Sequence, residues 1–279
     1  MTNLALAGRT FDLTHRCLVM GILNLTPDSF SDGGRFMNTD AALAHVQNMV
    51  QAGADIIDVG GESTRPGARR ISAEEEARRI LGVITAIVTR FDVPVSVDTS
   101  KAYVADLAIE AGAAMINDVS GLGFDPDMVA VAVKARAPVV IMHSSAEPEV
   151  MQQHTTYQDV VAEVRDALWG RARFAQEQGI DPGNIILDPG LCFGKTVEQN
   201  FSLIRRLDEI VKLGYPVLVG ASRKSFIGAT LNLPTDQRLE GSLAMQCAAY
   251  LGGVRIFRVH DVEPAVRAAR MLEALDMAP

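Results

Sequence analysis

The stretch Met20–Phe36 reads MGILNLTPDSFSDGGRF, and it holds the pattern that decides the fold. An apolar run ends at Leu23, the polar Asn24 follows, and the chain then enters a loop rich in Pro, Gly and Ser. This order is typical of a buried strand that delivers a polar side chain into a loop. The same order recurs along the chain, which favours an α/β barrel with polar side chains at one rim.

Eight such apolar runs alternate with helical patterns. Because the runs are nearly continuous, they indicate parallel strands covered on both faces. The predicted strands are Leu18–Leu23, Asp55–Val59, Val93–Val97, Ala114–Asn117, Val139–Met142, Ile185–Leu187, Val217–Val219 and Arg255–Arg258. The predicted helices are Asp40–Ala52, Ala73–Thr89, Ala102–Ala111, Pro126–Ala135, Tyr157–Gln178, Gln199–Leu213, Leu239–Leu251 and Pro264–Leu275.

Eight alternations predict a single (β/α)8 TIM barrel, with long mobile loops after the first and second strands. A doubly wound sheet is the alternative, but a count of eight favours closure. Ser72 and Thr39 are expected to cap helices. We expect one domain over residues 1–279, with the barrel at about 17–276 and residues 1–16 as a short preface.

Composition narrows the class of protein. The net charge of −8 argues against nucleic acid or an acidic membrane as the main partner. No apolar run approaches the roughly 20 residues that span a bilayer, and no signal peptide is recognisable at the N-terminus. Three cysteines are too few for a disulfide framework, so a cytoplasmic location is expected.

Two groups of polar residues follow the predicted strands. Carboxylates and an amide accept hydrogen bonds from the N–H groups of a flat heterocycle, and a lysine is suited to a ring carbonyl. This first group is Asp98, Asn117, Asp188 and Lys224. Guanidinium and imidazolium groups suit a phosphate or pyrophosphate. This second group is Arg65, Arg258 and His260.

Other chemistry is less well supported. Asn24, Asp58 and the aspartates of the first loop are candidate ligands for Mg²⁺, which takes few protein oxygens besides substrate phosphates. The scattered histidines do not suggest zinc. Cys192 is a possible nucleophile, but a cysteine after a glycine turn is more often a small apolar residue.

The chain resembles dihydropteroate synthase in seven motifs, in order from about residue 18 to 262. The motifs are MGILNLTPDSFSDGG, IIDVGGESTRPG, VDTSK, INDVSG, LDPGLCFGK, VGASRKSFIG and RVHDV. The resemblance implies condensation of 6-hydroxymethyl-7,8-dihydropterin pyrophosphate with p-aminobenzoate in folate biosynthesis. It also implies Mg²⁺, an SN1-like loss of pyrophosphate that leaves positive charge on the pterin methylene, and a homodimer. The helices Leu239–Leu251 and Pro264–Leu275 are candidates for the dimer face.

The resemblance also assigns roles to single residues. Pterin binding falls to Asp98, Asn117, Met142, Asp188 and Lys224, and pyrophosphate binding to Asn24, Arg65, Arg258 and His260, with Asn24 at the metal. The expected p-aminobenzoate site comprises Phe30, Thr64, Pro66, Phe193, Lys224 and Ser225. The expected catalytic residues are Asp98, Lys224, Arg258, His260 and Asn24.

Two departures from the family pattern and two alternative functions remain open. Cys192 stands where the family usually has glycine, and the sequence IMHSSAEPEV departs from the usual continuation after the histidine. One alternative is a pterin-binding methyltransferase domain that serves a corrinoid protein, and the other is a non-catalytic homologue. The intact SDGGRF and STRPG loops and the predicted anion site disfavour both.

Overall fold

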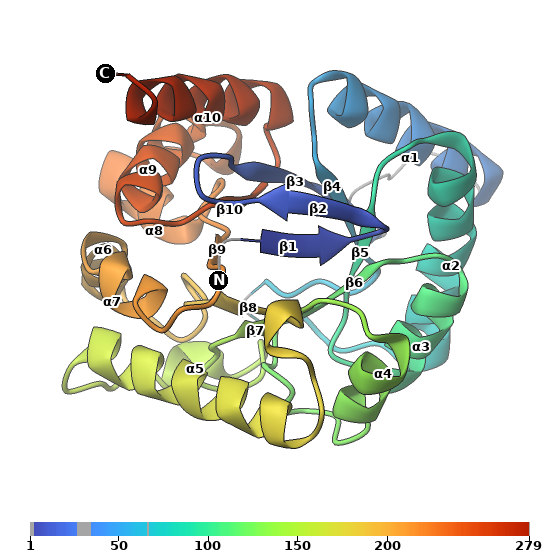
Figure 1. Cartoon of the computed structure of the whole chain (residues 1–279), viewed down its shortest axis with the longest axis horizontal. Helices are drawn as coiled ribbons and strands as arrows, with labels where there is room; N and C mark the ends of the chain where they lie inside the picture. The colour runs from blue at the N-terminus through green and yellow to red at the C-terminus, as the bar shows by residue number, and fades with distance from the viewer. Residues whose placement is uncertain (1–2, 27–34, 66, 279) are drawn as a thin grey trace.

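The computed structural model describes residues 3–26, 35–65 and 67–278, and a ring of parallel strands lies at its centre (Figure 1). The ring comprises β3 (Leu18–Asn24), β4 (Ile56–Gly60), β5 (Val95–Asp98), β6 (Met115–Asp118), β7 (Val139–Met142), β8 (Ile185–Asp188), β9 (Leu218–Val219) and β10 (Ile256–Val259). These eight strands pair in the order β8-β7-β6-β5-β4-β3-β10-β9, and a parallel bridge between Leu187 and Val217 closes the ring. The predicted barrel is confirmed.

Alternate residues of each strand belong to different cores, which explains the continuous apolar runs. Met20 and Ile56, for example, pack inside the barrel, whereas their neighbours Val19 and Ile57 pack against the surrounding helices. Both faces are therefore dry, as in other parallel sheets that are covered by helices.

Residues 3–12 form a hairpin that the sequence analysis did not predict. Strands β1 (Asn3–Leu6) and β2 (Arg9–Asp12) pair antiparallel and lie across the near end of the barrel in Figure 1. Leu4, Leu6 and Phe11 join the interior barrel core there. The expected short preface before the barrel is therefore this hairpin, which fills the N-terminal end of the barrel.

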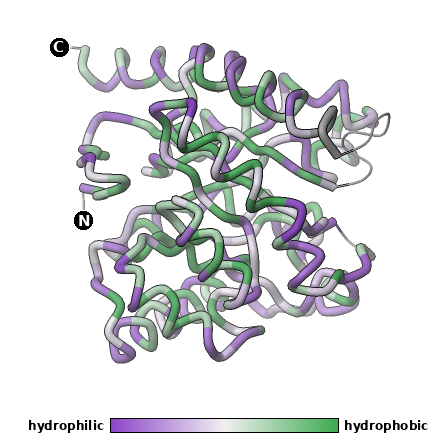
Figure 2. Tube along the Cα trace, turned by 90° about the vertical axis from the view of Figure 1, so that its right-hand side faces the viewer, coloured by the Kyte–Doolittle hydropathy of each residue, from purple (hydrophilic) through white to green (hydrophobic). Residues whose placement is uncertain are grey.

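Helices surround the ring and, in Figure 2, several of them alternate hydrophobic and hydrophilic turns, as expected when one face packs on the sheet. They are α1 (Arg35–Gln51), α2 (Ala73–Arg90), α3 (Ala102–Glu110), α4 (Met128–Ala135), α5 (Val160–Glu177), α6 (Val197–Arg205), α7 (Leu207–Val211), α8 (Ser225–Leu231), α9 (Leu239–Leu251) and α10 (Val262–Asp276). Short 3₁₀ turns lie at Met151–Gln153, Pro182–Asn184 and Thr235–Gln237.

Local signals placed some helix ends correctly and others not. The Ser72 side chain accepts from the backbone N–H of Glu75, so the predicted cap of α2 is confirmed. Thr39 lies inside α1, and that cap prediction was wrong because the helix begins four residues earlier. The single helix predicted over Gln199–Leu213 is broken at Arg206, whose backbone is not helical.

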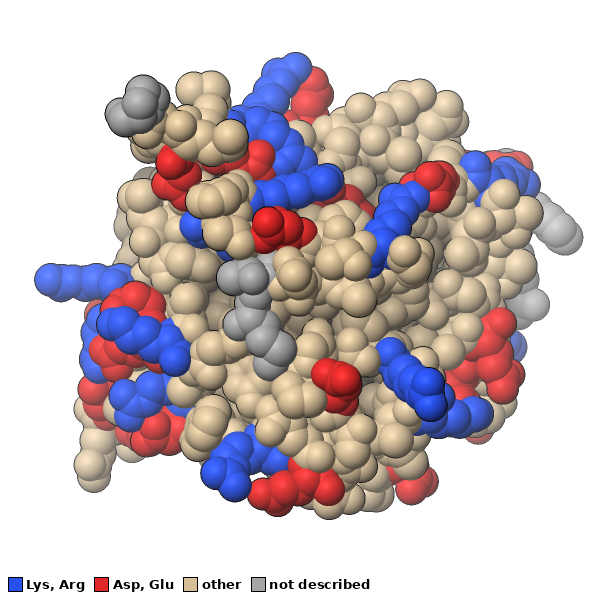
Figure 3. All heavy atoms as spheres, in the orientation of Figure 1, with Lys and Arg blue, Asp and Glu red and all other residues tan. Residues whose placement is uncertain are grey.

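The described residues on the face of the molecule that carries the hairpin form no large patch of a single charge. In Figure 3, acidic and basic side chains lie interspersed around the hairpin face. Among the described helices, none is both long and apolar enough to cross a membrane.

Candidate active site at the barrel mouth

The predicted site residues lie at the carboxyl ends of the strands, opposite the hairpin. Asn24, Asp98 and Asp188 are the last residues of β3, β5 and β8, and Asn117 is the third residue of β6. Asp98, Asn117 and Asp188 are at most 7% exposed. Parallel strands place their carboxyl ends at one rim, so these side chains share one mouth.

Arg258 joins the two groups that were predicted separately. From β10 its Nε donates to Asp58 Oδ2 at 2.6 Å, and its Nη2 donates to Asp98 Oδ2 at 2.6 Å. Asn117 Nδ2 also donates to Asp58 Oδ2, at 3.0 Å. One guanidinium therefore connects the heterocycle group to the anion group.

Asp58 is a site residue whose role the sequence analysis missed. It is fully buried in the middle of β4, where it binds Arg258 and Asn117. The available signal was a carboxylate inside the apolar run IIDVG, because a buried charge needs a buried partner. Arg258, 200 positions further along the chain, is that partner of Asp58, which had been predicted as a metal ligand.

Burial dominates the electrostatics at the base of the mouth. It raises the pKa of Asp98 to about 7, with Arg258 opposing the shift and the charges of Asp58, Glu76 and Asp118 reinforcing it. Among the described residues, Asp98 Oδ1 and Asp58 Oδ1 have no hydrogen-bond partner. The mouth thus presents buried acceptor oxygens that remain available to a ligand with N–H groups.

Asp188 and Lys224 form the side of the mouth near β8. Asp188 Oδ1 accepts from the backbone N–H of Gly190 at 2.7 Å, and burial raises the pKa of this carboxyl. Lys224 Nζ donates to the carbonyl of Leu191 and lies 4.8 Å from the ring centroid of Phe193. Burial lowers the pKa of Lys224. Phe193 also packs with Met142, so residues predicted for the two substrates adjoin.

Lys195 and His143 fix the loop that follows β8, and neither had a predicted role. The buried Lys195 Nζ lies 3.0 Å from His143 Nδ1 and donates to the carbonyls of Gly190 and Phe193 at 2.9 Å. Burial lowers the pKa of Lys195 to about 7 and that of His143 to about 3. Gly190 has φ +66°, and a Cβ there would lie 1.9 Å from the His143 carbonyl oxygen, so glycine is required.

Cys192 occupies a backbone conformation that favours glycine. Its φ is +69°, in the left-handed region, which is consistent with the family's usual glycine at this position. Its N–H donates to Asn200 Oδ1 at 2.7 Å, and its Sγ accepts a 3.5 Å hydrogen bond from Ser225 Oγ. The thiol therefore lies against one of the residues predicted to bind p-aminobenzoate.

His260 lies beside the cations of the anion group. Its Nδ1 lies 3.1 Å from Ser222 Oγ. Burial lowers the pKa of His260 to about 4, and the charges of Arg258, Arg223 and Arg65 lower it further, while Asp261 opposes them. A neutral ring is therefore favoured in the free protein near pH 7, in contrast to the imidazolium predicted from the sequence.

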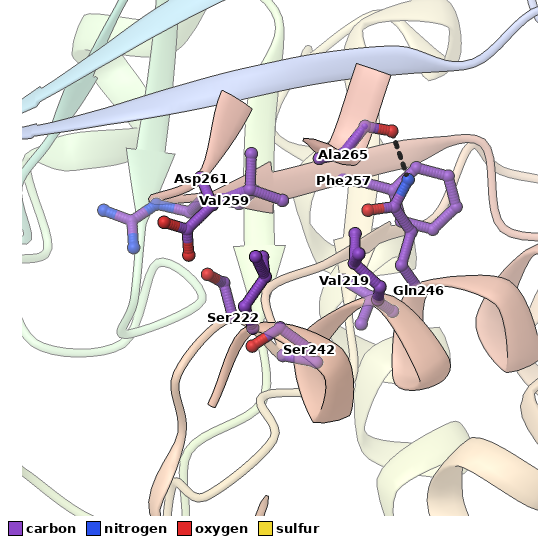
Figure 4. A pocket seen from close by; sticks show the side chains of 12 residues that line it. Val219, Ser222, Ser242, Gln246, Phe257, Val259, Asp261 and Ala265 are labelled. Atoms are coloured by element: carbon purple, nitrogen blue, oxygen red, sulfur yellow. Dashed lines mark hydrogen bonds between the residues drawn. The ribbon is translucent and has the colours of Figure 1, made fainter. Parts of the chain in front are cut away.

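A small cavity lies behind Ser222 and Arg258, between β9, β10, α9 and α10 (Figure 4). Gln246 at its edge donates to the Ala265 carbonyl at 2.9 Å. The space is about 20 Å³, enough for one water molecule, so it is too small for a substrate.

The loop after β4 carries Thr64, which is partly buried, and Arg65, which is exposed. Its Gly67 N–H donates to the Pro148 carbonyl at 3.2 Å, and Arg70 pairs with Glu147 at 3.1 Å. The unusual segment after β7 therefore contacts this loop directly. Two residues predicted for the p-aminobenzoate site, Phe30 and Pro66, lie outside the described residues.

Fold and site together define a (β/α)8-barrel enzyme whose mouth combines buried acceptors with cations. The family model described as "Pterin binding enzyme" matches residues 20–260. The dihydropteroate synthase of Synechocystis is 47% identical over 270 residues, covering 96% of this chain and 93% of that protein. The chain belongs to the pterin-binding enzymes and, among them, to the dihydropteroate synthase family.

Solved structures agree with this assignment. The Xanthomonas albilineans dihydropteroate synthase with 4-aminobenzoic acid aligns with a TM-score of 0.93 and 42% identity, covering 100% of this chain and 99% of that one. The same organism's enzyme in complex with 7,8-dihydropteroate gives a TM-score of 0.90 and 40% identity, covering 99% and 100%.

Proposed function

We infer that this chain is a transferase that condenses 6-hydroxymethyl-7,8-dihydropterin pyrophosphate with p-aminobenzoate, giving 7,8-dihydropteroate and pyrophosphate. The observation that carries the proposal is the position of Arg258. One methylene joins the pterin to its pyrophosphate, so a pterin site and an anion site must adjoin. Arg258 donates to Asp98 and lies two residues before His260 at the end of β10, so the pterin carboxylate and the anion group adjoin.

In this reaction the carboxylates and the amide act on the pterin, and the cationic residues act on the pyrophosphate. Asp98, Asn117 and Asp188 accept from or orient the pterin ring, and Asp98 stabilises the positive charge that develops as the methylene C–O bond breaks. The bonding electrons leave with the pyrophosphate. Arg258, Arg65 and the imidazole N–H of His260 bind this anion. The aryl amine attacks the methylene carbon and releases one proton. Thr64, Phe193, Lys224 and Ser225 surround p-aminobenzoate.

Asn24 fits a Mg²⁺ ion that arrives with the pyrophosphate. A Cβ added to Gly60 would lie 3.7 Å from Asn24 Oδ1 and 3.5 Å from Asp98 Oδ2, so both oxygens border the same side of the mouth. In residues 3–26, 35–65 and 67–278, no cluster of His, Cys, Asp or Glu is suited to hold a metal by itself. Mg²⁺ takes most of its ligands from water and phosphate, so the Asn24 side-chain oxygen would be one of few protein ligands, and the ion would neutralise charge on the pyrophosphate.

The proposal extends to assembly and location. Leu251, Met271, Leu275 and Met277 are 66–74% exposed on α9, on α10 and just after it, which favours a homodimer through this face. All three cysteines are free thiols, which favours a reducing cytoplasm.

Pyrophosphate release by the purified protein tests the function. The assay contains the pterin pyrophosphate, p-aminobenzoate and Mg²⁺, with each omitted in turn. We expect release only when all three are present. Tight pterin binding without release would contradict the proposed activity and favour a non-catalytic relative.

A further inference from the structure

A buried ion cluster lies beneath the loop after β4, outside the residues that contact substrate in the proposed function. Lys101 Nζ lies 2.9 Å from Glu62 Oε1 and 2.5 Å from Glu76 Oε2. The three side chains are 12%, 15% and 1% exposed, respectively. Buried ion pairs of this kind contribute little net stability, because desolvation offsets their attraction.

The cluster holds both ends of one loop. Glu62 Oε1 also accepts from the backbone N–H of Ile71 at 2.7 Å, which closes the segment 62–71 at its base. Arg79 Nη1 donates to the Gly61 carbonyl at 2.9 Å, just before this segment. Thr64 and Arg65, assigned to p-aminobenzoate and pyrophosphate, lie inside the closed segment.

The same cluster reaches the base of the mouth. Lys101 follows Asp98 by three residues, and its N–H donates to Thr99 Oγ1 at 3.2 Å. Lys101 therefore links the strand end that carries the pterin carboxylate to the loop that carries Thr64.

We propose that Lys101 is a positioning residue: its ion pairs with Glu62 and Glu76 hold the base of the 62–71 loop, so that Thr64 and Arg65 face the second substrate and the leaving group. This role rests on the proposed function. It requires no contact between Lys101 and substrate. A displacement of about 1 Å at the base of this loop would lower the reaction rate steeply, because the rate depends on how the reacting groups are positioned.

The test uses Lys101→Met and the double variant Lys101→Met/Glu76→Gln. The double variant removes one positive and one negative charge, so it does not leave the buried Glu76 carboxylate without a cation and is less prone to unfold. We expect KM for p-aminobenzoate to rise about tenfold or more in both, while the dissociation constant of the bare pterin stays within about threefold. Lys101→Arg should recover most of the loss. Lys134→Met, which removes an exposed lysine paired with Asp106, is the matched control and should resemble wild type.

A second measurement does not depend on activity. Trypsin cleavage after Arg69 and Arg70, mapped by mass spectrometry well below the thermal midpoint of each protein, should be faster in both Lys101 variants than in wild type. Unchanged cleavage, or a parallel loss of pterin and p-aminobenzoate affinity, would overturn the positioning role. Inactive wild-type protein with accelerated cleavage in the variants would instead overturn the proposed reaction alone.

Discussion

Arg258 donates to Asp58 and Asp98 at once, so a single cation compensates two buried carboxylates at the base of the mouth. Only partial compensation follows, and the pKa of Asp98 stays raised. The site is thus prepared for a ligand that brings N–H donors or positive charge.

Pterin binding should depend on pH through Asp98. An ionised carboxylate accepts two hydrogen bonds, whereas the protonated form loses one acceptor position. Because the pKa is raised to about 7, affinity for the bare pterin should increase as pH rises through about 7. Calorimetric titration from pH 5.5 to 8.5 measures this. Asp98→Asn should bind weakly without the inflection, and an unchanged inflection in that variant would refute the assignment.

The pH dependence of stability has the opposite sign to the pH dependence of pterin affinity. A folded-state pKa above the unfolded value of about 3.9 means that Asp98 contributes stability fully below about pH 4, and this contribution is lost as pH rises through about 7. The free energy of unfolding of Asp98→Asn should therefore increase relative to that of wild type from pH 5 to pH 8. Urea unfolding at both values measures the difference, and no trend would contradict the raised pKa.

Asp188→Asn should weaken pterin binding about 10- to 100-fold, roughly 1.5–3 kcal/mol, because a charged acceptor is replaced by a neutral amide. Oδ1 is already hydrogen-bonded to Gly190, so the backbone contact limits any change of the fold. Titration with the bare pterin measures the loss. Asp166→Asn, at a side chain that is 69% exposed, is the control. Equal affinity in wild type and Asp188→Asn would remove this residue from the pterin site.

At the scale of elements, the hairpin of β1 and β2 closes the N-terminal end of the barrel. Leu4 and Leu6 alternate with exposed residues and enter the interior core. The two strands are only four residues each, so they depend on the barrel for their stability.

Leu4→Ala should destabilise the fold by about 2–5 kcal/mol, because it leaves a cavity in the interior core. Both KM values and kcat at 25 °C should stay near wild type, since the hairpin lies at the end of the barrel opposite the mouth. Thermal unfolding and steady-state kinetics measure the two effects. Asn3→Ala, at an exposed position of the same strand, is the control. A large loss of kcat in folded Leu4→Ala would contradict this separation.

The barrel strands and most helices could be predicted from the sequence, because apolar runs and caps such as Ser72 are local signals. The hairpin was missed, although Leu4, Leu6 and Phe11 carried the alternation, because its partner surface exists only after the barrel closes. The site residues could be listed from strand ends. Their connections could not, since the pairing of Asp58 with Arg258 joins residues 200 positions apart.

At the scale of the whole molecule, the exposed apolar residues of α9 and α10 predict self-association. Met271→Lys combined with Leu275→Lys should convert the dimer into a monomer of about 30.0 kDa. The reason is that burying two lysine charges in the interface is unfavourable. Sedimentation equilibrium measures the mass. Tyr103→Lys on α3, at a residue that is 54% exposed, is the control. A wild-type monomer at all concentrations, or a dimer that survives both substitutions, would contradict the proposed face.

The hairpin fills the N-terminal end of the barrel, and the ligand-facing side chains lie at the other end. In the proposed function, a pterin pyrophosphate bound at the buried Asp98 and Asn117 would lie deeper than p-aminobenzoate bound at the partly buried Thr64. The reaction would then have a compulsory order, in which the pterin pyrophosphate binds before p-aminobenzoate and the joined product leaves before the next pterin enters.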